Sequence, residues 1–480
     1  MTPPQLILFI SILNLMSFSQ KIIAKPTPLS QAEEKKLTLK QQLGKKLFFD
    51  KNLSSPVGQS CASCHDIKTS LTDTIQNSPV SSGAVSERTG TRNTPSAAYS
   101  AFAPKFHFDK EEELYIGGQF LDGRAANLKE QAKAPFLNPD EMNNSDEQSV
   151  ITKIKASNYS KLFQQVFGEE ILNNTAEAYD KMAQAIVSFE NTPSFNRFTS
   201  KYDYYLAGRV KLSEQEQKGL ELFEDEKKGN CAACHISKTD DGKLPLFTDF
   251  TYDNLGTPSN PEVLALKGDD FIDIGLGETV GSSENGKFKV PSLRNVAKTA
   301  PYMHNGVFSD LKEVVDFYNT RDIDSKWPTP EVTENVNTDE LGDLKLTDDE
   351  VDAIVVFMRT LSDGYQLREK STYSAKEGII ELPYFRVESI TRPDKFYSAR
   401  LQSTADGYFE VTYLNKISIN NFSLVESMPY YSVETGLLEL PKLSSTDGAN
   451  KIVSLTGQYK YTSENVEKIV FKLIYVKKLQ

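Results

Sequence analysis

Two copies of one short motif contain every cysteine in the chain. Residues 61–65 read CASCH and residues 231–235 read CAACH. In a C-x-x-C-H motif each thiol can form a thioether to a vinyl group of haem, and the adjacent histidine can bind the iron. Two disulfides, or a zinc site built from both cysteine pairs, would use the same residues. Since each pair has its own histidine and no cysteine is left over, the pattern predicts two covalently bound c-type haems. The predicted attachment residues are Cys61, Cys64, Cys231 and Cys234, and the predicted iron ligands are His65 and His235.

A longer internal repeat surrounds the two motifs and indicates which elements must position them. An amphipathic stretch precedes each motif, a Leu-Thr-Asp or Phe-Thr-Asp triplet follows it, and each half later contains Ala-Ile-Val-x-Phe. The matching segments are 43–50 and 219–225, 71–73 and 247–249, and 185–189 and 353–357. We therefore predict two mainly helical cytochrome c-like domains, at 20–205 and 206–365. In each, haem would fill a core that short helices could not fill alone.

The pattern changes to that of β-strands from about Gly378. The sequence GIIELP at 378–383 is echoed by GLLELP at 436–441, and polar and apolar residues alternate at 408–413. We predict a linker at 370–376 and a small all-β, sandwich-like extension at 378–480. This extension contains no cysteine or histidine, so no redox centre is expected in it.

Composition and charge narrow the class of protein. The 480 residues are 39% hydrophobic and 25% charged, which is typical of a globular protein with two or three domains. The net charge of -12 argues against a nucleic-acid partner and would attract a small basic redox protein. Residues 1–19 contain an apolar run and a small-x-small end, so we predict a cleaved export signal and a soluble, periplasmic or otherwise exported protein. A retained membrane anchor is the alternative.

Further segments outside the haem motifs are distinctive in combination. They are RNTPS at 92–96, DGRA at 122–125, EQAKAP at 130–135, EM at 141–142, and VPSLRN at 290–295 followed by APYMHNG at 300–306. With these segments, residues 37–362 resemble the bacterial dihaem cytochrome c peroxidase / MauG family. The resemblance implies that hydrogen peroxide reacts at the first haem. It also implies that electrons arrive through the second haem from a small cytochrome or copper protein.

The resemblance also assigns three residues to the open side of the first haem. They are Glu141, Gln131 and Pro135. Peroxide must lose a proton from the oxygen that binds iron and gain one on the oxygen that leaves, and one carboxylate can do both. Glu141 is therefore the expected general acid/base. Without the resemblance, these residues would be interpreted as a solvated loop acid, a helix-surface amide and a helix terminator.

Axial ligands of the two irons follow from where histidine and tyrosine occur. The loop at 66–91, which supplies a blocking histidine in many family members, has none, so an open first haem is expected. His107 is interpreted as a structural residue. Tyr318 occupies the place of the family's methionine ligand, and a phenolate would favour ferric iron at the second haem. Met303 or Met358 is the alternative ligand, and His304 is expected to orient the haem surroundings.

One position departs from the family, and one further site is implied by it. Leu121 stands where the family usually has a tryptophan between the haems, and it cannot relay a hole, so rapid charge sharing is in doubt. The only tryptophan of the chain is elsewhere, at Trp327. The resemblance further implies a calcium ion, held by the Asn93 side chain and the backbone carbonyls of Thr299 and Pro301.

Three functions remain open at this stage. The first is a dihaem peroxidase; the second is a MauG-like enzyme that oxidises side chains of a partner protein. The third is a dihaem electron carrier without catalysis, against which an acid above an open haem argues. Members of the family often pair, so a homodimer is possible.

Overall fold

The computed structural model describes residues 37–365 except 74–77, 209, 240 and 241, and a set of C-terminal segments. These segments are 372–374, 377–389, 392–405, 408–417, 429–433, 435, 437–446, 452–461 and 470–478. The expected export signal at 1–19 lies outside the described residues. The contacts divide the chain into two units, one of which is 34–365 while the other contains 366–480. No described helix is both long and apolar enough to span a bilayer.

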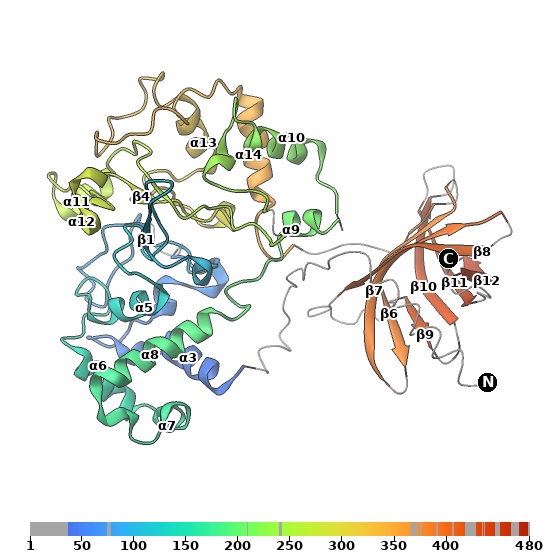
Figure 1. The fold of residues 1–480 in the computed structure, drawn as a ribbon, viewed down its shortest axis with the longest axis horizontal. Helices are drawn as coiled ribbons and strands as arrows, with labels where there is room; N and C mark the ends of the chain where they lie inside the picture. Colours follow the sequence, from blue (N-terminus) through green and yellow to red (C-terminus); the bar gives the residue numbers. More distant parts are fainter. Residues whose placement is uncertain are drawn as a thin grey trace. The chain divides into compact units, whose positions relative to one another are not determined.

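The first unit is mainly helical and consists of an N-terminal half, residues 37–208, and a C-terminal half, residues 210–365. Figure 1 shows α3, α5 and α8 side by side in the first half, and α10, α13 and α14 together in the second. The helices of the first half are α3 (Leu39–Phe49), α4 (Cys61–Cys64), α5 (Leu128–Leu137), α6 (Glu147–Ala156), α7 (Ser160–Phe167), α8 (Thr175–Glu190) and α9 (Lys201–Leu206). Those of the second are α10 (Glu214–Glu224), α11 (Pro261–Lys267), α12 (Gly277–Val280), α13 (Leu311–Thr320) and α14 (Asp348–Arg359).

The internal repeat predicted from the sequence is present as a repeated helix crossing. Gly44 of α3 lies against the Ala185 carbonyl of α8, and Gly219 of α10 lies in the same way against the Ala353 carbonyl of α14. A Cβ at either glycine would clash with that carbonyl oxygen. The glycines therefore let the helix backbones approach closely.

Local capping explains where the crossing helices begin. Thr347 caps α14 by accepting from the Glu350 N–H, while Glu350 accepts from the Thr347 N–H. Ser213 and Glu216 form the same capping box at the start of α10. Such reciprocal bonds satisfy two of the backbone donors that a helix start leaves open.

The first unit also contains two short antiparallel strand pairs. Strand β1 (His107–Asp109) forms a hairpin with β2 (Leu114–Ile116), and β3 (Tyr252–Asp253) pairs with the more distant β4 (Phe288–Lys289). The hairpin is the insertion that contains His107.

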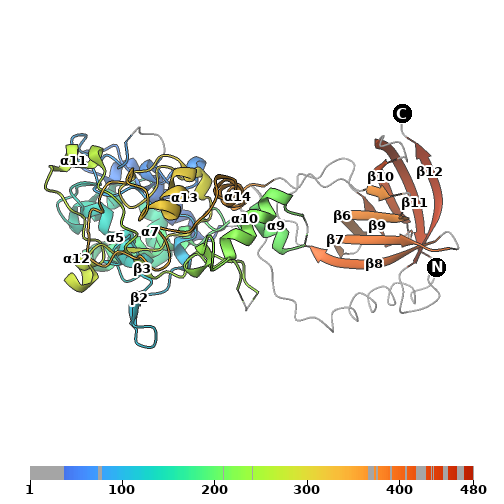
Figure 2. The same cartoon turned by 90° about the horizontal axis from the view of Figure 1, so that it is seen from above.

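The C-terminal unit is one sheet that closes on itself. Its strands are β5 (Thr372–Ser374), β6 (Ile379–Ser389), β7 (Arg392–Ser403), β8 (Tyr408–Ile417), β9 (Tyr430–Ser432), β10 (Leu437–Thr446), β11 (Ile452–Tyr461) and β12 (Val470–Lys478). Their order is β11-β12-β8-β7-β6-β5-β10-β9, and the pairings β11–β10 and β6–β9 complete the closure. Figure 2 shows the curl of these strands. The sandwich-like expectation was therefore wrong, because the strands pair in one continuous ring rather than in two stacked sheets.

The sequence echo in this unit corresponds to a structural duplication. Tyr373 of β5 pairs with Ile380 of β6, and Tyr431 of β9 pairs with Leu438 of β10. The short strands also cross over in the same way, since β5 runs parallel to β10 and β9 runs parallel to β6. Each half of the duplication thus completes the sheet of the other.

Candidate haem centres

The two CxxCH motifs have matching backbone geometry. Cys61 begins the single turn α4, and Cys231 begins a 3-10 turn (Cys231–Ala233). In both, the histidine N–H donates to the first cysteine's carbonyl at 2.9 Å, as His65 to Cys61 and His235 to Cys231. All four cysteines are unpaired, and the described residues contain no group of three or more His, Cys, Asp or Glu placed to share a metal ion. The described residues therefore show neither a disulfide nor a site shared by both cysteine pairs.

Each motif histidine has one ring nitrogen engaged by a backbone carbonyl. His65 Nδ1 lies 3.0 Å from the Leu71 oxygen, and His235 Nδ1 lies 2.9 Å from the Phe247 oxygen. A carbonyl only accepts, so Nδ1 must hold the proton and the lone pair of Nε2 is free for a metal. Burial lowers the pKa of both histidines, which keeps them neutral. These are the properties of a histidine that binds haem iron.

The two accepting carbonyls are themselves held in equivalent ways. The Leu71 oxygen also accepts from the Ala97 N–H at 3.0 Å, and the Phe247 oxygen accepts from the Leu293 N–H at 3.3 Å. Leu71 and Phe247 both have positive φ, 62° and 55°. Spacing alone could not identify these partners, although the repeated Leu-Thr-Asp and Phe-Thr-Asp triplets mark their positions.

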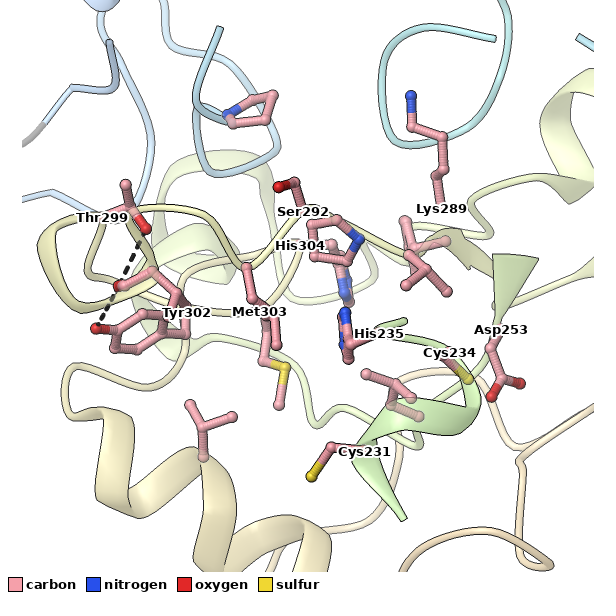
Figure 3. A pocket seen from close by; sticks show the side chains of 18 of the residues that line it. Cys231, Cys234, His235, Asp253, Lys289, Ser292, Thr299, Tyr302, Met303 and His304 are labelled. Atoms are coloured by element: carbon pink, nitrogen blue, oxygen red, sulfur yellow. Dashed lines mark hydrogen bonds between the residues drawn. The ribbon is translucent and has the colours of Figure 1, made fainter. Parts of the chain in front are cut away.

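A cavity of about 340 Å³ surrounds the second motif. Cys231, Cys234 and His235 line it, and Figure 3 shows the His235 ring between the two cysteines and the Met303 thioether. Its lining is mostly apolar, with few polar groups, as in pockets that enclose a flat organic cofactor. The donor set and the enclosure both fit a covalently attached haem.

All three candidates for the sixth ligand of the second iron line this same cavity. Tyr318 comes from α13, Met303 from the segment before it and Met358 from α14. Burial raises the pKa of Tyr318, and the charges of the nearby cysteine thiols act in the same direction. Among the described residues, none hydrogen-bonds to the Tyr318 hydroxyl, so this oxygen is available to another partner.

Glu141 lies close to the first motif and is half-buried. Asn138 Nδ2 donates to Glu141 Oε1 at 2.7 Å, and the Glu141 carbonyl accepts from the Ala84 N–H at 2.6 Å. Burial raises the pKa of Glu141. Burial is also the main reason why the pKa of the Cys61 and Cys64 thiols is raised, and the charge of Glu141 adds a smaller effect in the same direction. A half-buried carboxyl beside this motif can exchange protons with a small ligand.

Gln131 and Pro135 lie one turn apart on α5, so they share a face of the helix. The Pro135 carbonyl accepts from the Met142 N–H at 3.1 Å, which holds the end of α5 against the residue after Glu141. The structure thus brings the three predicted residues to one side of the N-terminal half.

The remaining histidines take different positions. His107 is exposed on β1, and its Nδ1 faces the Lys105 carbonyl at 2.9 Å, which fits the structural interpretation. His304 is buried in the cavity lining, where it stacks on Phe288 with ring centroids 3.8 Å apart and approaches Glu331 at 3.0 Å.

Asn93, Thr299 and Pro301 also line the cavity together. Asn93 Nδ2 donates to the Pro79 carbonyl at 2.9 Å, so the amide oxygen is the atom not used in this bond. The three residues can offer one amide oxygen and two carbonyl oxygens, which suits a hard cation.

A buried ion pair joins the two halves beside the cavity. The Arg92 guanidinium binds Asp122 at 2.5 Å and Asp273 at 2.6 Å, and both aspartates are almost fully buried. Leu121, next to Asp122, lines the cavity, whereas Trp327 packs against Phe317 and does not line it. In the sequence Arg92 is distinctive only as part of the RNTPS motif. Its ion-pair partners Asp122 and Asp273 are identified only by the tertiary structure.

Comparisons with known proteins agree with these features. A family model described as di-haem cytochrome c peroxidase matches residues 38–211. The chain is 39% identical over 343 residues to the methylamine utilization protein MauG of Paracoccus denitrificans, covering 67% of this chain and 88% of that protein. It is 31% identical over 316 residues to a cytochrome c551 peroxidase of Pseudomonas aeruginosa, covering 65% of this chain and 81% of that protein. The crystal structure of the diheme peroxidase BthA from Burkholderia thailandensis matches with a TM-score of 0.64 and 34% identity, covering 68% of this chain and 86% of that chain.

Proposed function

The chain belongs to the dihaem cytochrome c peroxidase / MauG family, and from this premise we propose that it reduces hydrogen peroxide to water with electrons from a small redox protein. The observation that carries the proposal is the half-buried carboxyl of Glu141, with its raised pKa, beside the first of two equivalent haem motifs. An electron carrier would not need a proton-exchanging group there.

We infer two cytochrome c-like domains, at 20–205 and 206–365, that hold one haem each. Cys61 and Cys64 would attach the first, with His65 as its only protein ligand, and Cys231, Cys234 and His235 would hold the second. When bound, haem iron supplies the site where peroxide coordinates and the electrons that cleave its O–O bond. The Nδ1 hydrogen bonds to Leu71 and Phe247 orient the two histidines for that role.

Glu141 acts as the acid/base of the proposed reaction. Its carboxylate takes a proton from one peroxide oxygen and returns it to the oxygen that leaves as water. The raised pKa of Glu141 brings its two protonation states closer in free energy near neutral pH, and Asn138 holds one of its oxygens in place. Gln131 and Pro135 would border the same space, the first as a hydrogen-bond donor and the second as an apolar wall.

Tyr318 is the proposed sixth ligand of the second iron. Its hydroxyl lacks a hydrogen-bonding partner among the described residues, and its side chain lines the cavity with His235. Substitution of Tyr318 by Phe should therefore change the ferric signal of the second haem, while Met303→Leu should not. The reverse result would make Met303 the ligand.

A second candidate is oxidation of side chains in a partner protein. The 39% identity to a MauG protein favours it. So does the position of Tyr318 in the cavity of the second motif, because a phenolate ligand there would favour ferric iron. Leu121 weakens it, because an aliphatic side chain cannot share charge between the haems. We also propose a calcium ion at Asn93, Thr299 and Pro301, export to the periplasm, and pairing into a homodimer.

Low-temperature EPR of the oxidised, haem-loaded protein tests the peroxidase proposal. One high-spin and one low-spin ferric signal, both lost promptly when peroxide is added without prior reduction, are expected for an open first haem. Glu141→Gln should slow that loss, while Glu112→Gln, an exposed acid on the turn between β1 and β2, should not. Two low-spin haems that ignore peroxide until reduced would contradict the proposal.

A further inference from the structure

Tyr99 lies where the two halves of the first unit meet. It is only 2% exposed and has a φ of 62°, and Asn295 occupies the matching place in the other half with a φ of 65°. Both follow a Pro-Ser pair whose serine bonds to an equivalent carbonyl, as Ser96 Oγ donates to Ser70 at 2.7 Å and Ser292 Oγ donates to Leu246 at 2.6 Å. Tyr99 and Asn295 are therefore counterparts in the internal repeat.

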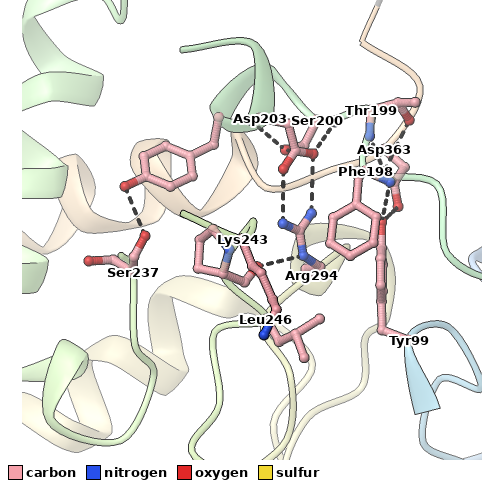
Figure 4. Close-up of polar contacts among 12 residues, drawn as sticks. Tyr99, Phe198, Thr199, Ser200, Asp203, Ser237, Lys243, Leu246, Arg294 and Asp363 are labelled. Atoms are coloured by element: carbon pink, nitrogen blue, oxygen red, sulfur yellow. Dashed lines mark hydrogen bonds and ion pairs between the residues drawn. The ribbon is translucent and has the colours of Figure 1, made fainter. Parts of the chain in front are cut away.

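Asp363 joins these two counterparts. The Tyr99 hydroxyl donates to Asp363 Oδ2 at 2.7 Å, and Asn295 Nδ2 donates to the same oxygen at 2.8 Å. The Tyr99 hydroxyl also accepts from the Phe198 N–H at 2.8 Å, so its single proton must face the carboxylate. Figure 4 shows Tyr99 pointing at Asp363.

A buried cation lies beside the Tyr99 ring. The Arg294 guanidinium is 4.9 Å from the ring centroid and forms two bonds to Asp203, at 2.9 and 3.1 Å. Removing an electron alone from Tyr99 would create a second positive charge next to Arg294 in a poorly solvated place, which is costly. Loss of an electron together with the proton avoids that charge, and the Asp363 carboxylate is already positioned to take the proton.

Short connections lead from Tyr99 toward both haem motifs. On the N-terminal side, the Ala97 N–H, two residues before Tyr99, donates to the carbonyl that also accepts from His65 Nδ1. On the C-terminal side, Tyr99 lines the cavity that contains His235. The Leu293 N–H, adjacent to Arg294, bonds to the carbonyl that accepts from His235 Nδ1.

We propose that Tyr99 relays electrons between the two haem centres, the role that Leu121 cannot perform. In the first step Tyr99 gives one electron to the N-terminal centre after peroxide has oxidised it, and its O–H proton moves to Asp363 Oδ2. In the second step one electron from the C-terminal centre returns to Tyr99, and the proton returns from Asp363 to the phenol oxygen. The net result is one electron moved from the C-terminal to the N-terminal half, with Tyr99 and Asp363 unchanged.

Other aromatic residues near the cavity lack this combination. The Tyr252 hydroxyl donates to the Gly117 carbonyl at 2.6 Å, and a neutral amide oxygen is a much weaker base than a carboxylate. Phe120 and Phe288 line the cavity but have no proton to transfer and resist oxidation. Burial also raises the pKa of Tyr99 well above its usual value, so the phenol keeps its proton until the electron leaves.

The inference rests on the proposed peroxidase function, and a stopped-flow experiment on the holoprotein separates the two. The protein with its second haem reduced is mixed with peroxide, and two phases are followed by absorbance. The first phase reports the reaction of peroxide at the N-terminal haem, and the second reports oxidation of the C-terminal haem. Absence of the first phase in the natural sequence would reject the peroxidase function itself.

Tyr99→Phe keeps the ring and removes only the transferable proton. The second phase should slow by about tenfold or more, equivalent to about 1.4 kcal/mol in the barrier, while the first phase stays unchanged. Tyr202→Phe is the matched control, because Tyr202 is equally buried and donates to a backbone carbonyl, that of Ser237, at 3.2 Å. The second phase should also be slower in D2O for the natural sequence and the control, and not for Tyr99→Phe.

An unchanged second phase in Tyr99→Phe, or no D2O effect on the natural protein, would overturn the relay. A purely structural role of Tyr99 would alter folding or haem spectra but produce no D2O effect on the second phase. If Tyr99→Phe fails to incorporate both haems, Asp363→Asn provides the second variant. It keeps the phenol and removes the base, so it should slow the second phase and abolish its D2O dependence, and the opposite result counts against the relay.

Discussion

Replacing Glu190 by Gln should remove a strong pH dependence from the stability of the first unit. Glu190 is the last residue of α8, and its side chain is only 5% exposed. Its Oε2 atom is buried without a hydrogen-bond partner. Burial raises the pKa of Glu190 from 4.5 to about 8, because the charged form loses its hydration there.

The sign of the effect follows from which state holds the proton. Between pH 4.5 and pH 8 the folded protein keeps the Glu190 proton while the unfolded chain has lost it. The free energy of unfolding therefore falls as the pH rises through this window, by about 1.4 kcal/mol per pH unit. Relative to pH 4.5, this amounts to about 3 kcal/mol of lost stability at pH 7 and about 4 kcal/mol at pH 8. A neutral amide has no such dependence.

Urea unfolding of the holoprotein, followed by circular dichroism from pH 5 to pH 8, measures the effect. The free energy of unfolding of Glu190→Gln, minus that of the natural protein, should increase as the pH rises. Comparing the difference across pH removes the cost of burying the amide itself, which is the same at every pH. Glu177→Gln, an exposed acid in the first turn of the same helix, is the control and should follow the natural protein. If the free energy of unfolding changed with pH in the same way for Glu190→Gln and for the natural protein, the argument would be refuted.

Three further outcomes are expected. Gly219→Ala should lower the stability by about 1–3 kcal/mol, because the added methyl meets the Ala353 carbonyl where two helices cross. A drop in Tm measures this, and Gly90→Ala, which has more space, should leave Tm unchanged. Glu141→Gln should slow the reaction with peroxide by about 10²–10⁴-fold in stopped-flow traces. Because the base form is lost at low pH, the natural rate should fall as pH drops through the raised pKa of Glu141, and a flat profile would contradict this role. Arg92→Met leaves the buried Asp273 without its cation and leaves Asp122 with only the more exposed Arg124, so urea unfolding should show a loss of about 3–5 kcal/mol. A loss below about 1 kcal/mol would mean that water replaces the guanidinium.

Features that depend on neighbouring residues were predictable from the sequence. The haem motifs are local, since the two thiols and the histidine that can hold one cofactor lie within five residues. The repeated helices follow from apolar periodicity and from caps such as Thr347 with Glu350. Family membership followed from combined motifs, and the relatives confirm it. The roles of Glu141, Gln131, Pro135 and Tyr318 stay predictions, as does calcium binding.

Features that depend on pairing between distant segments were not predictable. The alternating pattern after Gly378 indicated strands, but the closure through β10–β11 and β6–β9 depends on which edges meet, and one sheet or two can share the same pattern. Similarly, nothing in the sequence links Tyr99 to Asp363, or Arg92 to Asp273.

The sequence by itself determined the chemistry that the chain can hold, because covalent attachment and metal ligation are properties of residue type and short spacing. Only the tertiary structure decided which groups are buried and what they face. A carboxyl such as Glu190 has an ordinary pKa in water and a raised one when its hydration is removed, and a tyrosine such as Tyr99 can exchange a proton only with the base placed beside it. Both properties arise from residues brought together by folding, and no local pattern records them.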